Sequence, residues 1–187
     1  AAHAVPVNVV TVEPHPVQVQ EQISGRTVSY RIAEVRPQVN GVLQKRLFTE
    51  GQMVKAGQPL YQIDASVYNA NVQSAKASLA QAEAALALAR ANAARSATLV
   101  KENAVSKQSD DTAQAQVRTD EAAVKAARAA LTNAQINVQY TYVRAPISGH
   151  VSISEVTPGA LMTAYQSQRM TVIHQLDPIY VDAVSYT

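Results

Sequence analysis

The chain has 187 residues, which is enough for one or two domains with a modest core. Apolar residues make up 47% of it but aromatic residues only 5%, so the chain lacks the large side chains that are typical of a compact enzyme core. With a charged fraction of 16% and a net charge of +2, the chain lacks the strongly basic character that is typical of nucleic-acid-binding proteins. Because cysteine is absent, disulfides, thiolate metal ligands and thiol catalysis are excluded.

Valines alternate with other residues near the start of the chain, at Val5, Val7 and Val9 and again at Val17 and Val19. A period of two is typical of β-strands. We therefore expect strands in this segment, with pairing partners beyond the C-terminal end, and interpret the sequence as a fragment of a longer protein.

Long helices are predicted for the middle of the chain. All six glycines and all eight prolines lie outside residues 60–145, and alanine dominates residues 65–139. Apolar residues recur there every seven positions, with alanine three positions after most of them, which predicts an antiparallel coiled coil whose helices approach closely. The large apolar residues are Val72, Leu79 and Leu86 in one track and Val117, Val124, Leu131 and Val138 in the other. Asp120 occupies a contact position where the pattern favours alanine.

A short turn is predicted between the two tracks. Asn103 is a suitable residue for a left-handed helix stop, and Ser106 is a good N-cap for a second helix. The two helices then span residues 65–102 and 106–139. A single long dimerisation helix is the alternative, but the stop and start signals favour a hairpin.

The segments on either side of the helices resemble each other. Residues 35–41 (VRPQVNG) can be laid on residues 143–149 (VRAPISG), and a further glycine follows each match ten residues later, at Gly51 and Gly159. Both flanks show the short apolar runs and glycine turns of strands. Two similar half-units separated by a helical insertion are expected to pair into one small β domain, which requires the ends of the insertion to lie side by side.

Several of these stretches together resemble a known family. Residues 50–60 (EGQMVKAGQPL) are similar to the first half of a biotinyl/lipoyl domain. Residues 140–149 (YTYVRAPISG) and 175–181 (QLDPIYV) resemble the periplasmic adaptors, or membrane fusion proteins, of tripartite RND multidrug efflux pumps of the AcrA/MexA type. The family's tip motif, Arg-x3-Leu-x6-Ser, matches Arg95, Leu99 and Ser106.

The resemblance implies an α+β multidomain fold in which a coiled-coil hairpin is inserted into a split lipoyl-like β domain. The implied divisions are membrane-proximal strands at 1–24, a β-barrel strand at 25–33, a first lipoyl-like half at 34–64, the α-helical hairpin at 65–139, a second lipoyl-like half at 140–175 and the start of another β-barrel strand at 176–187.

The same resemblance implies a non-enzymatic adaptor without a cofactor, periplasmic and associated with the inner membrane. It would bridge an inner-membrane RND transporter and an outer-membrane channel of the TolC type, as a ring of six copies. The residues implied to contact the channel are Arg95, Leu99, Val105 and Ser106. Leucine offers apolar surface for burial, and arginine offers several hydrogen-bond donors in a fixed arrangement.

Two other classes of protein remain open alternatives. An adaptor for type I secretion or another transporter class would share the split lipoyl domain, although the tip motif and residues 175–181 argue against it. A biotin or lipoyl carrier needs a lysine on a tight hairpin, but the long helix is predicted to begin there, and Lys55 fits better as a surface lysine.

The remaining candidates for chemistry are weak. The four histidines are His3, His15, His150 and His174, and no two of them have the helical spacing of metal ligands. No metal site is therefore expected. Asp110 and Asp111 are interpreted as solvated residues near a helix start rather than as an acid–base pair.

Overall fold

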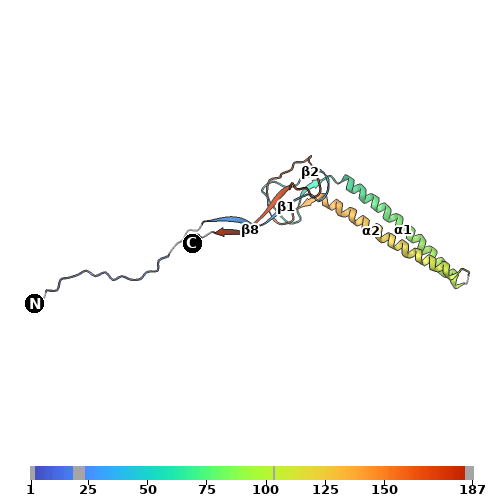
Figure 1. Ribbon diagram of the computed structural model, residues 1–187, viewed down its shortest axis with the longest axis horizontal. Helices are drawn as coiled ribbons and strands as arrows, with labels where there is room; N and C mark the ends of the chain where they lie inside the picture. The colour runs from blue at the N-terminus through green and yellow to red at the C-terminus, as the bar shows by residue number, and fades with distance from the viewer. Residues whose placement is uncertain (1–2, 19–23, 103, 184–187) are drawn as a thin grey trace.

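The computed structural model describes residues 3–18, 24–102 and 104–183. Two groups of strands pack together, and two long helices project from them as a rod (Figure 1). None of the described helices is both long and apolar enough to cross a membrane. The elements in chain order are β1 (Gly25–Val35), β2 (Gly41–Arg46), β3 (Met53–Val54), β4 (Pro59–Ile63), α1 (Ser66–Lys101), α2 (Lys107–Tyr140), β5 (Tyr142–Arg144), β6 (Gly149–Val151), β7 (Leu161–Met162) and β8 (Thr171–Ala183).

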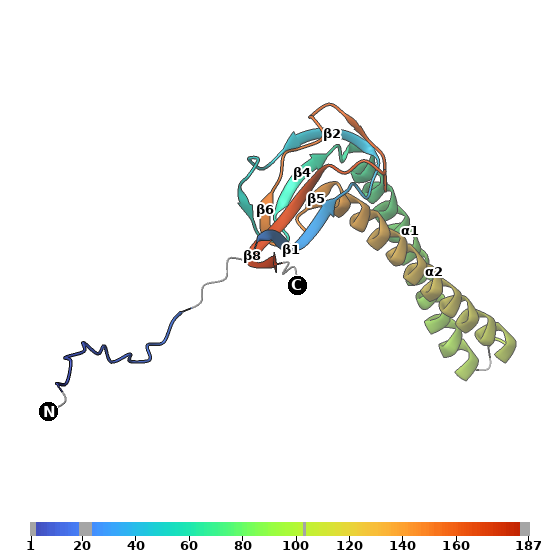
Figure 2. The same cartoon turned by 60° about the vertical axis from the view of Figure 1, so that its left-hand side comes forward.

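The strands form two four-stranded sheets, with the orders β1-β8-β6-β3 and β5-β4-β2-β7 among the described residues. Each sheet combines strands that precede the helices with strands that follow them, and every adjacent pair is antiparallel. The two flanking segments therefore pair with each other, as their sequence similarity predicts. Together the sheets and helices give a mixed α+β fold (Figure 2).

The core lies between the two sheets. Leu43, Leu60, Tyr61, Ile63 and Ile173 have no solvent-exposed surface, and they come from β2, β4 and β8. Such complete burial of large side chains, at roughly 1.5–3 kcal/mol each, is the main force that holds the flanks together.

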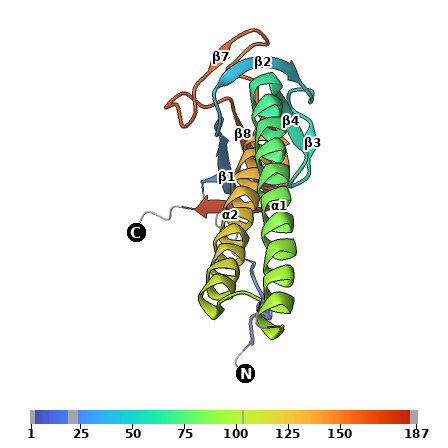
Figure 3. The same cartoon turned by 90° about the vertical axis from the view of Figure 1, so that its right-hand side faces the viewer.

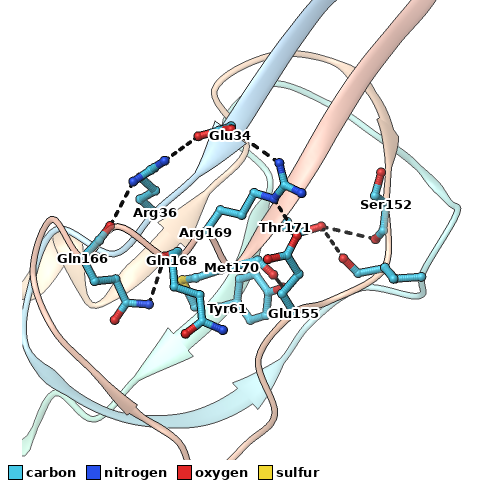
Figure 4. Close-up of polar contacts among 11 residues, drawn as sticks. Glu34, Arg36, Tyr61, Ser152, Glu155, Gln166, Gln168, Arg169, Met170 and Thr171 are labelled. Carbon is cyan, nitrogen blue, oxygen red and sulfur yellow. Dashed lines mark hydrogen bonds and ion pairs between the residues drawn. The ribbon is translucent and has the colours of Figure 1, made fainter.

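Polar groups inside this core have partners. The hydroxyl of Tyr61 donates to the carbonyl oxygen of Met170 at 3.1 Å, and the hydroxyl of Thr171 donates to the carbonyl oxygen of Ile153 at 3.0 Å (Figure 4). Burial raises the pKa of the Tyr61 phenol, which therefore stays neutral and able to donate. The tyrosine ring also meets Phe48 edge-on, with ring centroids 5.2 Å apart.

A chain of ion pairs joins the end of β1 to the segment before β8. Glu34 contacts Arg36 at 2.6 Å and Arg169 at 3.5 Å, and Arg169 also contacts Glu155 at 2.5 Å (Figure 4). The hydrogen bond from Arg36 and the charges of both arginines lower the pKa of the Glu34 carboxyl. Because these groups are exposed, the network orients the loop more than it stabilises the fold.

The helices α1 and α2 lie side by side and run antiparallel; they are called the helical pair below (Figure 3). Their bounds lie within one residue of the predicted ones. Ion pairs cross between them, from Arg90 to Glu121 at 2.8 Å and from Arg128 to Glu83 at 3.5 Å. The most buried side chains of the pair belong to Val72, Leu86, Ala89, Ala93 and Val124.

Asp120, which departs from the alternation of large and small residues, is half-buried at the contact between the helices. Its Oδ1 accepts a hydrogen bond of 2.9 Å from Nε2 of Gln116, one turn earlier on the same helix. One carboxylate oxygen of Asp120 therefore has its hydrogen-bond partner within α2 itself.

The strands predicted from the alternating valines do not form in residues 3–18. This segment has no regular secondary structure, and Val5 and Val17 are 78% and 82% exposed. A strand needs a hydrogen-bonding neighbour, and the segment runs away from both sheets (dark blue in Figure 1). Val19 lies outside the described residues.

The strands β1 and β8 extend beyond the sandwich as a two-stranded ribbon. The sequence analysis places one domain boundary between residues 33 and 34 and another between residues 175 and 176. In the structure these positions lie inside β1 and β8 and not between elements. The ladder shifts register between Ser29 and Arg31: Arg31 pairs with Gln175, but Ser29 pairs with Ile179. This irregularity within continuous strands, not a chain break, lies between the sandwich and the ribbon.

Gly149→Ala is expected to destabilise the β domain, by about 2–4 kcal/mol. A Cβ added at Gly149 would lie 2.4 Å from the carbonyl oxygen of His174, so β6 and β8 would have to separate. Urea denaturation measures the change. Ile153→Ala is the control, because Ile153 is 69% exposed and should change stability little. Equal stability of the two variants would show that the strands do not approach this closely.

The helical pair leaves and re-enters the sheet at one point. The amide of Ile63 donates to the carbonyl oxygen of Thr141 at 2.8 Å, and Gln62 pairs with Tyr142 across β4 and β5. We therefore expect that replacing residues 66–140 by a short Gly-Ser turn leaves both sheets folded. Dispersed amide resonances by NMR would be the expected result, and an unfolded spectrum would contradict it.

Candidate functional site

The end of the helical pair lies far from the sheets (Figure 1). The helices have 36 and 34 residues, so at 1.5 Å per residue they extend about 50 Å. Residues 95–102 and 104–106, called the tip below, are therefore remote from the β core. At that distance the β core cannot constrain which side chains occur at the tip. Only packing within the helical pair can do so.

Capping interactions determine where the chain turns. α1 is capped by Glu102, and the amide of Ala104 donates to the carbonyl oxygen of Leu99 at 2.9 Å. Ser106 is the N-cap of α2, where its hydroxyl accepts a hydrogen bond of 3.3 Å from the amide of Ser109. The predicted cap is thus confirmed, whereas the predicted stop at Asn103 lies outside the described residues.

The structure brings the four predicted contact residues to this one end. Leu99 is 40% exposed. Arg95 and Ser106 are exposed, and Val105 is half-buried. The guanidinium of Arg95 contacts Oδ1 of Asn92, one turn earlier, which holds it along the helix. The tip thus presents apolar surface beside hydrogen-bond donors.

The sequence analysis is wrong about Asp110. Its Oδ1 is enclosed, as is Oγ of Ser96, and neither atom has a hydrogen-bond partner among the described residues. Asp110 lies seven residues before Val117 and therefore continues the contact track of α2. Extending the seven-residue repeat by one step would have placed it there.

An open groove runs along the helical pair next to the tip. Small and amide side chains line it, and they come from both helices. Its lining residues are Ala89, Asn92, Ser106, Gln108, Ser109, Thr112, Ala113 and Gln116. The groove offers hydrogen-bonding groups and room for side chains of a partner, but it contains no ionisable pair for catalysis.

At the other end of the helical pair, the position of a carrier lysine is taken by the start of α1. The carboxylate of Asp64 accepts hydrogen bonds from the amide of Ser66 at 3.0 Å and from its hydroxyl at 2.6 Å. These bonds lower the pKa of Asp64. The chain therefore continues into a helix where a carrier domain would form a tight hairpin.

Two of the four histidines meet in the β domain. His150 on β6 and His174 on β8 are directly opposed partners in the ladder. Sequence spacing did not indicate this, because the usual spacing rules apply within one element and these residues belong to two. No group of three or more potential metal-ligating side chains occurs in residues 3–18, 24–102 and 104–183.

The geometry combines a β sandwich with a pair of long helices that project from it and end in the tip. The chain belongs to the RND MFP barrel-sandwich hybrid domain family, which it matches over residues 31–174.

Similar proteins support this assignment. The antibiotic efflux pump periplasmic linker protein ArpA of Pseudomonas putida is 48% identical over 187 residues, which cover 100% of this chain and 47% of that protein. The multidrug export protein AcrE of Escherichia coli is 50% identical over 176 residues, 94% of this chain and 46% of that protein. The chain thus spans less than half the length of these relatives.

A solved structure shows the same architecture. A MacA-MexA chimera that contains the Pseudomonas aeruginosa MexA α-hairpin domain matches with a TM-score of 0.53 at 32% identity. The match covers 82% of this chain and 51% of the chimera.

Proposed function

We propose that this chain is the part of a periplasmic adaptor that carries a coiled-coil hairpin inserted into a split lipoyl-like β domain. The hairpin would be the helical pair, and the two halves of the lipoyl-like domain would be the strands on either side of it. The single observation that carries the proposal is the return of the chain at Ile63 and Thr141, because it makes the helices an insertion into an otherwise continuous sandwich.

The longer protein would bridge an inner-membrane RND transporter and an outer-membrane channel of the TolC type, as a ring of six adaptors in the periplasm, associated with the inner membrane. The names of the relatives, a periplasmic linker of an efflux pump and a multidrug export protein, support this role. In that role the adaptor catalyses no reaction, and its contribution is to connect two membrane proteins.

The tip would contact the channel through Arg95, Leu99, Val105 and Ser106. Exposure of Leu99 supports this assignment, since its apolar side chain has little of the protein's own core to join. The ribbon of β1 and β8 would continue into a β-barrel. Residues 1–24 would belong to a membrane-proximal region, and they would form strands only where further strands of the longer protein supply their hydrogen bonds. Exposed apolar side chains on the ribbon, such as Ile179 and Val181, are consistent with further strands packing there.

Site-specific cross-linking tests the proposal in cells that express the longer protein. Because this chain has no cysteine, Ser106→Cys introduces a single attachment point for a cross-linker within it. We expect Ser106→Cys to cross-link an outer-membrane channel. Lys76→Cys, exposed near the base of α1, is the matched control and should not. Equal labelling from both positions, or none from Ser106→Cys in protein that still assembles, would contradict the proposed orientation.

A further inference from the structure

The opposed histidines lie on the exposed side of the first sheet. His150 on β6 faces His174 on β8, and directly opposed residues in an antiparallel ladder have Cβ atoms about 4.5–5.5 Å apart. Both line one open hollow, together with Ser29, Glu50 and Leu176. His150 is exposed and His174 is half-buried, so a solute can reach both rings.

Hydrogen bonds orient the two rings. Nδ1 of His150 lies 3.1 Å from the carbonyl oxygen of Gly51, beside β3, and Nδ1 of His174 lies 3.1 Å from the hydroxyl of Ser29 on β1. In the order β1-β8-β6-β3 these partners flank the pair on opposite sides. In each ring Nδ1 is therefore engaged by a group outside the pair, which leaves Nε2 as the nitrogen available to a ligand.

The same bonds determine the tautomer of His150. A carbonyl oxygen only accepts, so Nδ1 of His150 carries the hydrogen and Nε2 keeps its lone pair. The serine hydroxyl beside His174 can accept from Nδ1 in the same way. A backbone carbonyl or hydroxyl on one ring nitrogen, with the other nitrogen free, is the arrangement that metal-binding histidines commonly adopt.

We propose that Nε2 of His150 and Nε2 of His174 bind one divalent transition-metal ion. Imidazole suits Cu²⁺ and Zn²⁺, and Cu²⁺ gives the stronger complex with a given set of nitrogen ligands. Glu50, the carboxylate of the hollow, has its Oε1 engaged by the amide of Ser154 and by Arg46. The site therefore has two protein ligands, and water or another small ligand completes the coordination.

Metal binding would link β6 to β8 through their side chains. β8 continues from the sandwich into the ribbon, so the ion would add a cross-link at the base of that ribbon. A ligand that binds only the folded state raises the melting temperature, which gives a readout that is independent of any transport assay.

Titration with CuSO₄ or ZnCl₂ tests the site. The reference protein is the full chain with His3→Gln and His15→Gln, because exposed imidazoles in the N-terminal segment would compete for the ion. We expect one ion per chain, by calorimetry, and a higher melting temperature. His150→Gln and His174→Gln, each in that background, should weaken binding about tenfold or more and remove the thermal shift. MgCl₂ should have no effect, since Mg²⁺ prefers oxygen ligands.

Ser29→Ala separates a positioned site from an adventitious one. Loss of the hydroxyl frees the His174 ring without removing a ligand, so affinity should fall by less than in His174→Gln. Circular dichroism confirms that each variant is folded. The proposal is overturned if the reference protein binds no metal, or if folded His150→Gln and His174→Gln variants bind Cu²⁺ and Zn²⁺ as tightly as the reference.

Discussion

Leu99→Asp is expected to abolish drug efflux by the longer protein while leaving the fold of this chain unchanged. Leu99 is 40% exposed and lies at the tip, about 50 Å from the β core. A charge placed where a partner buries an apolar side chain should cost about 2–4 kcal/mol of docking energy, which is about thirty- to a thousand-fold in affinity. Arg95→Ala should weaken docking in the same direction by removing several donors.

Drug susceptibility of cells that carry each variant measures this effect, together with protein level and thermal melting. Leu88→Asp is the matched control, because Leu88 is an exposed leucine on the same helix but three turns from Leu99. The tip assignment fails if Leu99→Asp leaves efflux intact at normal expression. It also fails if efflux is lost only because the helical pair unfolds.

Leu86→Asp is expected to unfold much of the helical pair. Leu86 is 9% exposed and Val124 on the facing helix is 8% exposed, and both line the same stretch of the contact between helices. Two cations that line this stretch are already engaged, Arg90 with Glu121 and Arg128 with Glu83. The third, Lys125, is solvent-exposed. An unpaired charge here should therefore cost about 2–4 kcal/mol.

The melting of helical ellipticity at 222 nm measures the loss. Leu88→Asp again supplies the control, since Leu88 is 61% exposed only two residues away and the same substitution should change little. Similar melting of the two variants would mean that the seven-residue repeat does not mark the contact between the helices.

The sequence predicts the helices well because their signals are local. Alanine content, the seven-residue repeat and the Ser106 cap all act within a few turns, and the observed bounds agree with the predicted ones to within one residue. The pairing of the flanks was also predictable, because a repeated glycine pattern marks equivalent turns. Asp110 could have been placed by the same repeat.

Contacts between distant segments were not predictable in this way. The pairing of His150 with His174 depends on the register of β6 against β8, and no spacing within one element encodes it. The alternating valines form no strand in residues 3–18 because a local pattern is not sufficient by itself. Their local pattern is typical of a strand, but a strand exists only where another backbone supplies its hydrogen bonds, and residues 3–18 have no such neighbour among the described residues.

Because Ile63 and Thr141 are adjacent, the length of the helices alone sets the distance between the tip and the sheets. Seven residues added to each helix would lengthen the rod by about 10.5 Å without moving a single strand. The tip would rotate by only about 20°, because seven residues are close to two full turns. The distance of the tip from the sheets can therefore be changed in discrete steps, while the point at which the helices leave the sheets stays the same.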